Sequence, residues 1–116
     1  MSTSNPVQEK SYAFALKIIG LYKEMVRKKE FTLSRQLLKS GTSIGANIEE
    51  ALQGQSRKDF ISKLSISLKE TCETKYWLRL LRDSRLLPET SCKIALDDVE
   101  ELKRLLTAIL KTTKKE

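Results

Sequence analysis

Three carboxylate side chains near the middle of the chain, Glu50, Glu70 and Glu73, are the first groups whose type and spacing suggest chemistry. Carboxylates on neighbouring helices bridge metal ions in some bundles, but those sites usually also contain Glu-x-x-His pairs, and this sequence has no His. Acid–base catalysis by paired carboxylates needs a pocket and groups that orient a substrate, and the sequence shows neither. We therefore expect no metal site and no catalytic carboxylates.

A complete set of residues for nucleophilic catalysis is also missing, and so is a phosphate-binding loop. Without His there is no imidazole base for a serine or cysteine nucleophile, and the serines lie on predicted helices rather than on a Gly-x-Ser-x-Gly elbow. No glycine-rich loop of the phosphate-cradling kind occurs. We expect a protein that is not an enzyme, binds no cofactor and has no evident small-molecule substrate.

The same carboxylates have a structural interpretation. A carboxylate removed from water needs a charged partner or several hydrogen-bond donors, and neighbouring Ser, Asn and Lys side chains supply donors at helical spacing. We predict one hydrogen-bonded network that fixes the register of two helices or a contact between subunits, with freely solvated faces as the alternative. Its predicted members are Ser43, Asn47, Glu50, Lys69, Glu70 and Glu73.

Tyr76 and Trp77 form an aromatic pair beside this group. Such a pair can stack on a nucleic-acid base, but a lone Trp among leucines more often anchors packing at an interface, which is the interpretation we favour. Basic side chains occur along the same segment, and they are candidates for contacts with the phosphates of a nucleic acid. These are Lys58, Lys63, Arg79, Arg82 and Arg85.

Four amphipathic helices position these residues, because apolar residues recur at spacings of three and four with only four Gly and two Pro in the chain. Ser56 and Asp59 resemble a capping box, Pro88 suits a first helical turn, and Gly41 and Gly45 predict the close approach of another helix. The predicted helices span about residues 7–29, 33–53, 57–82 and 88–112. We predict one all-α domain over residues 1–116, an antiparallel up-down-up-down four-helix bundle with polar tails.

The spacings also predict which residues form the core. In the first helix these are Tyr12, Ala15, Ile18, Ile19, Tyr22, Met25 and Val26, with Phe14 and Leu21 outside the stripe. In the second they are Leu33, Leu37, Ile44, Ile48, Ala51 and Leu52, and in the third Phe60, Ile61, Leu64, Leu68, Cys72 and Leu78. In the fourth they are Cys92, Ala95, Val99, Leu102, Leu105, Leu106, Ile109 and Leu110. The third helix also carries Ile66, Trp77 and Leu80 on the opposite face, so it needs a second partner beyond its own bundle.

Composition restricts the class of protein further. With 22 Lys and Arg against 15 Asp and Glu, the formal charge is +7, which fits either an ordinary solvated surface or a weak polyanion-binding face. Cys72 and Cys92 belong to no CxxC pair or Cys/His cluster, so we expect both to be buried, reduced thiols. No apolar run approaches the roughly 18 residues that cross a bilayer, so we expect a cytoplasmic protein without a membrane partner.

Three segments resemble a known family: Ser43-Ile-Gly-Ala-Asn47-Ile-Glu-Glu50-Ala51, Ser56-x-x-Asp59-Phe60-x-x-Lys63 and Lys69-Glu70-x-x-Glu73-x-x-Tyr76-Trp77-Leu78. Together they are similar to the bacterial four-helix-bundle proteins named after the intervening sequences of 23S ribosomal RNA. The resemblance implies a homopentameric ring without an established enzymatic activity. It also implies a relation to the accessory proteins of diversity-generating retroelements, which form pentameric barrels and bind reverse transcriptase and RNA. The expected function is a non-enzymatic, homo-oligomeric scaffold or adaptor, and the alternative is an RNA-binding accessory protein.

Overall fold

The computed structural model describes residues 5–115, which form four α-helices and no strand. The helices are α1 (Pro6–Arg27), α2 (Leu33–Leu52), α3 (Arg57–Asp83) and α4 (Glu89–Lys115). Each end lies within three residues of the predicted one, and the largest difference is at Lys115, where α4 runs past the predicted end at residue 112. No Gly or Pro follows residue 112 to stop the helix. The predicted tail at residues 1–4, and residue 116, lie outside the described residues.

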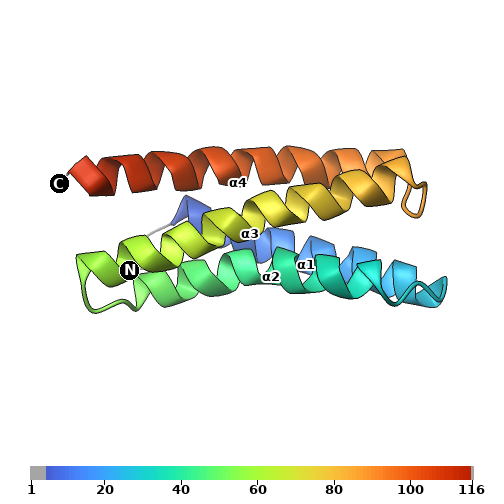
Figure 1. The fold of residues 1–116 in the computed structure, drawn as a ribbon, viewed down its shortest axis with the longest axis horizontal. Helices are drawn as coiled ribbons and strands as arrows, with labels where there is room; N and C mark the ends of the chain where they lie inside the picture. Colours follow the sequence, from blue (N-terminus) through green and yellow to red (C-terminus); the bar gives the residue numbers. More distant parts are fainter. Residues whose placement is uncertain (1–4, 116) are drawn as a thin grey trace.

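The four helices pack side by side into a rod of 47 × 26 × 23 Å (Figure 1). Each helix runs antiparallel to the next, so α1 and α3 point in the same direction. Among the described residues, α1 and α3 each contact α2 and α4, whereas the pairs α1/α3 and α2/α4 make no backbone contact. The helices therefore occupy the corners of a square, with α1 and α3 on one diagonal.

Polar side chains at the first turns explain where α1 and α3 begin. The side chain of Asn5 accepts a hydrogen bond of 3.1 Å from the backbone N–H of Gln8. The Ser56 hydroxyl accepts one of 3.0 Å from the backbone N–H of Asp59, which confirms the predicted cap of the third helix. Each bond satisfies an N–H group that has no partner inside its helix.

The cap of α2 comes from a residue outside the usual cap position. Thr32 makes no side-chain capping bond, and the Glu30 carboxylate accepts instead from the backbone N–H groups of Thr32, Leu33 and Ser34 at 3.2, 2.9 and 2.7 Å. Lys29 adopts a left-handed conformation, with φ of 65°, and so turns the chain between α1 and this cap. A carboxylate is a stronger acceptor than a hydroxyl and also suits the positive end of a helix.

The core face of α1 is rotated relative to the predicted one. Phe14 and Leu21, which the prediction placed outside the stripe, are buried, whereas Tyr12 is 65% exposed. The helix carries two apolar stripes at spacings of three and four, and periodicity alone does not tell which one packs inward. The buried residues of α1 are Val7, Ser11, Phe14, Ile18, Leu21 and Met25.

The core face of α3 is also different, because its middle consists of hydroxyl residues. Ser67, Thr71 and Thr74 are fully buried, whereas Cys72 is exposed, contrary to the prediction, and Leu68 is only partly buried. Small hydroxyl side chains fit a close helix contact, and all three donate hydrogen bonds to acceptors in the bundle, which removes the cost of burying them. The buried residues of α3 are Leu64, Ser67, Thr71, Thr74, Leu78 and Leu81.

The predicted core of the other two helices agrees better with the structure. In α2 the exceptions are Leu52, which is exposed, and Leu33, which is partly buried. In α4 the two residues at the edge of the stripe, Leu105 and Ile109, are partly buried. Cys92 is buried as predicted, and burial raises the pKa of its thiol, so it remains protonated at neutral pH.

Glycine allows α1 and α2 to approach closely, as predicted. A Cβ atom at Gly41 would lie 2.8 Å from Cγ1 of Ile18, and one at Gly45 would lie 3.3 Å from Oγ of Ser11. Both distances are shorter than ordinary van der Waals contacts between side chains. These two contacts fix the height of α1 relative to α2.

Candidate interaction surface on α2 and α3

The structure does not join the six predicted network residues within one subunit. Ser43 Oγ donates to the backbone oxygen of Lys39 at 2.6 Å, and Asn47 Nδ2 donates to the backbone oxygen of Ser43 at 2.8 Å, so both bonds remain inside α2. Gly41, Ser43 and Gly45 have the letter spacing of a nucleophile elbow, but they lie within a continuous helix. Ser43 therefore lacks the exposed turn that such a nucleophile needs.

One of the six residues does link the two helices. Glu50 of α2 forms an ion pair of 3.2 Å with Lys63 of α3, a residue that the sequence suggested for phosphate contacts. The Glu50 side chain is 60% exposed, so solvent screens this pair and its contribution to stability is small.

Buried hydroxyl groups that the sequence prediction missed make the main polar link between α2 and α3. Thr74 Oγ1 donates to Ser40 Oγ at 3.0 Å, and Ser67 Oγ donates to the backbone oxygen of Ile44 at 2.8 Å. The available signal was the spacing of Ser67, Thr71 and Thr74 at intervals of three and four. A pattern that counts only apolar residues does not detect it.

Glu70 and Glu73 interact with each other on the outer side of α3. Burial, followed by the negative charge and hydrogen bond of Glu73, raises the pKa of the Glu70 carboxyl, while Lys39 and Lys69 act in the opposite direction. Lys39 belongs to α2, so Glu70 lies close to the boundary between the two helices. No group of three or more potential metal-binding side chains occurs among residues 5–115.

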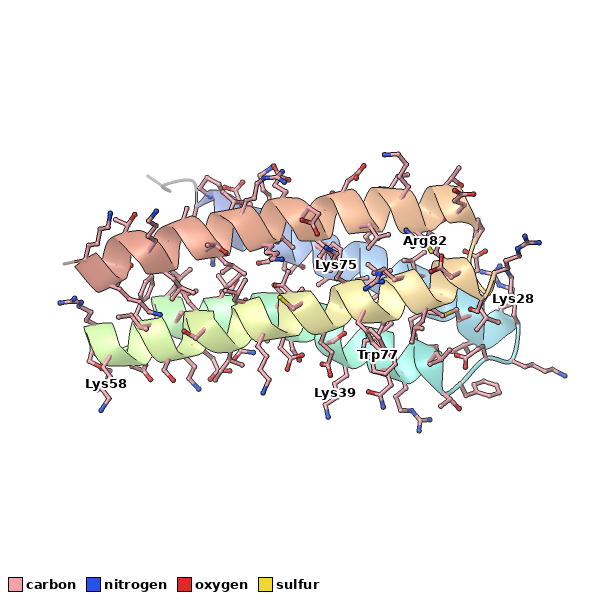
Figure 2. The ribbon with its side chains drawn as sticks, turned by 45° about the horizontal axis from the view of Figure 1, so that its top comes forward. Lys28, Lys39, Lys58, Lys75, Trp77 and Arg82 are labelled. Atoms are coloured by element: carbon pink, nitrogen blue, oxygen red, sulfur yellow. The ribbon has the colours of Figure 1, made fainter. Side chains whose placement is uncertain are left out.

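Aromatic and aliphatic side chains continue this outer surface. The rings of Tyr76 and Trp77 lie 5.2 Å apart in an edge-to-face arrangement, and Tyr76 is 51% exposed. Trp77 Nε1 is buried and has no acceptor within the described part of the chain. Ile66 and Leu80 are 40% and 37% exposed on the same helix, and Figure 2 shows Trp77 and Lys39 towards the same edge of the bundle.

The five basic residues predicted to contact phosphates do not form one patch. Lys58 lies near the start of α3 and Arg85 lies beyond its end, so the two residues are about 40 Å apart at a helical rise of about 1.5 Å per residue. Figure 2 shows Lys58 and Arg82 towards opposite ends of the bundle. Lys63 pairs with Glu50, and the Arg82 guanidinium binds the neighbouring carboxylate of Asp83 at 2.8 and 3.3 Å. Arg79 and Arg85 are exposed.

Two of these residues do line a common depression at the end of the bundle where α1 ends and α4 begins. Its volume is about 610 Å³, and it contains three basic and two acidic side chains. The residues that line it are Lys28, Arg82, Asp83, Arg85, Leu87, Pro88 and Glu89.

Within the described residues, no helix is long and apolar enough to span a membrane.

Comparison with known proteins identifies a family and similar solved structures. The model of the 23S rRNA-intervening sequence protein family matches residues 3–108. The fold is similar to the crystal structure of a protein of unknown function from the S23 ribosomal protein family of Bacteroides thetaiotaomicron VPI-5482, with a TM-score of 0.89 and 50% sequence identity. The alignment covers 90% of this chain and 98% of that chain. No curated protein matches the sequence.

Proposed function

Because the chain belongs to the 23S rRNA-intervening sequence protein family, we propose that it is a non-enzymatic, homo-oligomeric protein that acts as a scaffold or adaptor in the cytoplasm. A closed ring of five copies is the assembly that we favour, following the family resemblance of its sequence. The first partner of the protein is therefore another copy of itself.

The observation that carries this proposal is the outer surface of α3. Single exposed apolar residues are common on monomeric proteins, but Ile66, Tyr76 and Leu80 lie on one side of one helix, beside Trp77. The buried Nε1 group of Trp77 has no acceptor among residues 5–115, although Trp N–H groups usually find one. A neighbouring subunit would cover these rings and supply acceptors.

The character of the depression lined by Arg82 and Arg85 supports a non-enzymatic role. The depression at the end of the bundle where α1 ends and α4 begins is open and lined mainly by charged side chains. Active sites are usually concave and mainly apolar, with a few converging polar groups and perturbed pKa values. The carboxyl with the raised pKa, Glu70, lies outside that depression.

The mass of the purified protein in solution tests this proposal. Native mass spectrometry and light scattering at micromolar concentration should give a multiple of the 13.3 kDa subunit mass, with five subunits favoured. The mass should not change with added nucleic acid, because the proposed contacts are between copies of the chain. A monomer at these concentrations would contradict the proposal.

RNA binding is the second candidate, supported by the charge of +7 and by the end of the bundle where Lys28, Arg82 and Arg85 surround a depression. A ring would repeat this basic end in every subunit and strengthen its electrostatic field. Titration of a structured RNA at increasing salt should then give an affinity that falls steeply. Replacing Arg85 with Ala should reduce the salt slope, whereas Lys93→Ala on α4 is the control, because Lys93 already pairs with Asp97. No binding at low salt would exclude this candidate.

A further inference from the structure

We propose that the bundle opens along one of its four sides, the side between α1 and α4, while α2 and α3 stay packed together. The open form exposes an apolar slot between the first and the last helix. This motion takes place inside one subunit, so the inference goes beyond the proposed function and does not depend on the oligomer.

The connectivity of the chain distinguishes this side from the other three. Within the described chain, short loops join α1 to α2, α2 to α3 and α3 to α4, whereas α1 and α4 are the first and last helices and share no loop. The backbones of α1 and α4 also come near each other at the fewest places of the four adjacent pairs. Separation of these two helices therefore stretches no loop and breaks the smallest backbone contact.

Close packing and buried hydrogen bonds hold the two sides that adjoin α2. Gly41 and Gly45 bring the backbone of α2 against α1, where even a Cβ atom would be crowded. The buried hydroxyl groups of Ser67 and Thr74 donate hydrogen bonds from α3 to α2. Opening either side would forfeit these contacts or separate these hydrogen-bonded groups. Between α3 and α4, the backbones come near each other about as often as those of α1 and α2.

Ion pairs at the surface link α1 to α4. Lys10 of α1 pairs with Glu101 of α4 at 3.0 Å. One and two turns further along, Lys17 pairs with Asp98. The four side chains are 31–45% exposed, so water and salt screen both pairs, and each pair contributes little to stability. These pairs therefore resist the opening of this side only weakly.

Packing between the same two helices is incomplete. The four charged residues and Ala13 surround a depression of about 120 Å³, which the buried side chains of Phe14 and Leu102 also line. Atoms that face unfilled space lose the dispersion contacts that a packed neighbour would give. Phe14 and Leu102 are therefore held less firmly here than side chains in a filled core.

The slot that opening exposes has a defined chemistry. Phe14 contributes an apolar wall from α1, and Leu102 contributes one from α4. The lysines released from their ion pairs lie along the α1 edge, and the released carboxylates lie along the α4 edge. The open form is therefore an apolar slot between a basic edge and an acidic edge.

Hydrogen exchange of the backbone amides detects this opening. Helices of 22 and 27 residues that lose their packing are only marginally stable in water, so the amides of α1 and α4 exchange when the side between them opens. In the wild type, measured by mass spectrometry at one protein concentration, these amides should exchange about tenfold faster than those of α2 and α3. Equal exchange in all four helices would overturn the proposal.

Removal of the ion pairs tests what holds this side closed. Lys10→Gln and Lys17→Gln should each speed exchange in α1 and α4 about two- to fivefold, which is the range expected for an exposed pair. Lys63→Gln is the matched control, because it removes the exposed pair with Glu50 across the α2–α3 side and should leave exchange in α1 and α4 unchanged. An equal effect of all three substitutions would contradict the proposal.

A covalent link across the α1–α4 side tests the motion directly. In a Cys72→Ser background, which removes the exposed native thiol, a short bismaleimide should join the two thiols of Lys17→Cys, Asp98→Cys within one chain. Linking should slow exchange in α1 and α4 about fivefold relative to the same protein before linking. The control link between Glu50→Cys and Lys63→Cys spans the α2–α3 side and should leave that exchange unchanged. Exchange in α1 and α4 that does not slow in the Lys17→Cys, Asp98→Cys protein would overturn the opening of this side.

Discussion

The Glu30 carboxylate offers a sharp test of how the first turn of α2 is held. It accepts hydrogen bonds from the N–H groups of Thr32, Leu33 and Ser34, the shortest at 2.7 Å, and these groups have no partner within the helix. Burial acts to raise its pKa, but the hydrogen bonds from Leu33, Ser34 and Thr32 together outweigh burial, so the pKa of Glu30 is lowered. The folded state therefore favours the ionised form.

We expect Glu30→Ala to cost about 1–2 kcal/mol, the upper part of the range measured for helix caps, because three N–H groups lose their acceptor. Glu30→Gln keeps an oxygen acceptor but no charge, so its loss of stability should be roughly half of that expected for Glu30→Ala. For a domain of this size, 1 kcal/mol lowers Tm by about 4 °C. Because the pKa is depressed in the folded state, the stabilisation is present above the unfolded pKa of about 4.3 and is lost as pH falls through the folded pKa.

Thermal unfolding followed by circular dichroism, at one fixed protein concentration, measures these differences. The Tm of the wild type should be higher than that of Glu30→Gln at about pH 7, and the two Tm values should become equal at about pH 2.5. Asp97→Asn is the matched control, because Asp97 forms an exposed pair with Lys93 on α4 and should change Tm little at either pH. A Glu30→Gln protein that melts with wild type at neutral pH, or a gap that persists in acid, would refute this account of the cap.

Three further substitutions test other contacts. Gly41→Ala would place a methyl group 2.8 Å from Ile18, so we expect a loss of about 1–3 kcal/mol in chemical denaturation; an unchanged midpoint would contradict the close packing. Glu70→Gln should raise Tm at neutral pH, because the pKa of Glu70 is raised in the folded state and stability is lost as pH rises through that pKa. The gain in Tm should vanish in acid, where Glu70 is protonated, and a gain that does not depend on pH would contradict this reasoning. Asn47→Ala should leave the subunit folded, since Asn47 bonds only the Ser43 carbonyl in its own helix, and should lower the oligomer mass; an unchanged mass would exclude a role between subunits.

The number, type and approximate ends of the helices follow from the sequence, but the rotation of two helices does not. In α1 the stripe with Tyr12 and the stripe with Phe14 fit helical spacing equally well, and only packing against the neighbouring helices decides between them. In α3 the buried centre is polar, so Ser67 and Thr74 escape any search for apolar residues. The Glu30 cap was missed because Glu30 lies two residues before Thr32, which occupies the usual cap position, and binds N–H groups two to four positions further along.

The same physics explains why the candidate surface was only partly predictable. Sequence spacing placed Ser43 and Asn47 on one flank of α2 and Glu70 and Glu73 on the facing side of α3, but it left open whether they act within one subunit or between two. Inside the subunit, Ser43 and Asn47 bond the backbone of their own helix, and the hydroxyl of Thr74 makes the link between helices instead. A hydrogen bond to the same helix does nothing to fix helix register. Ser43 and Asn47 therefore do not join α2 to α3 within the subunit, and a contact of these two side chains with a second subunit stays a prediction.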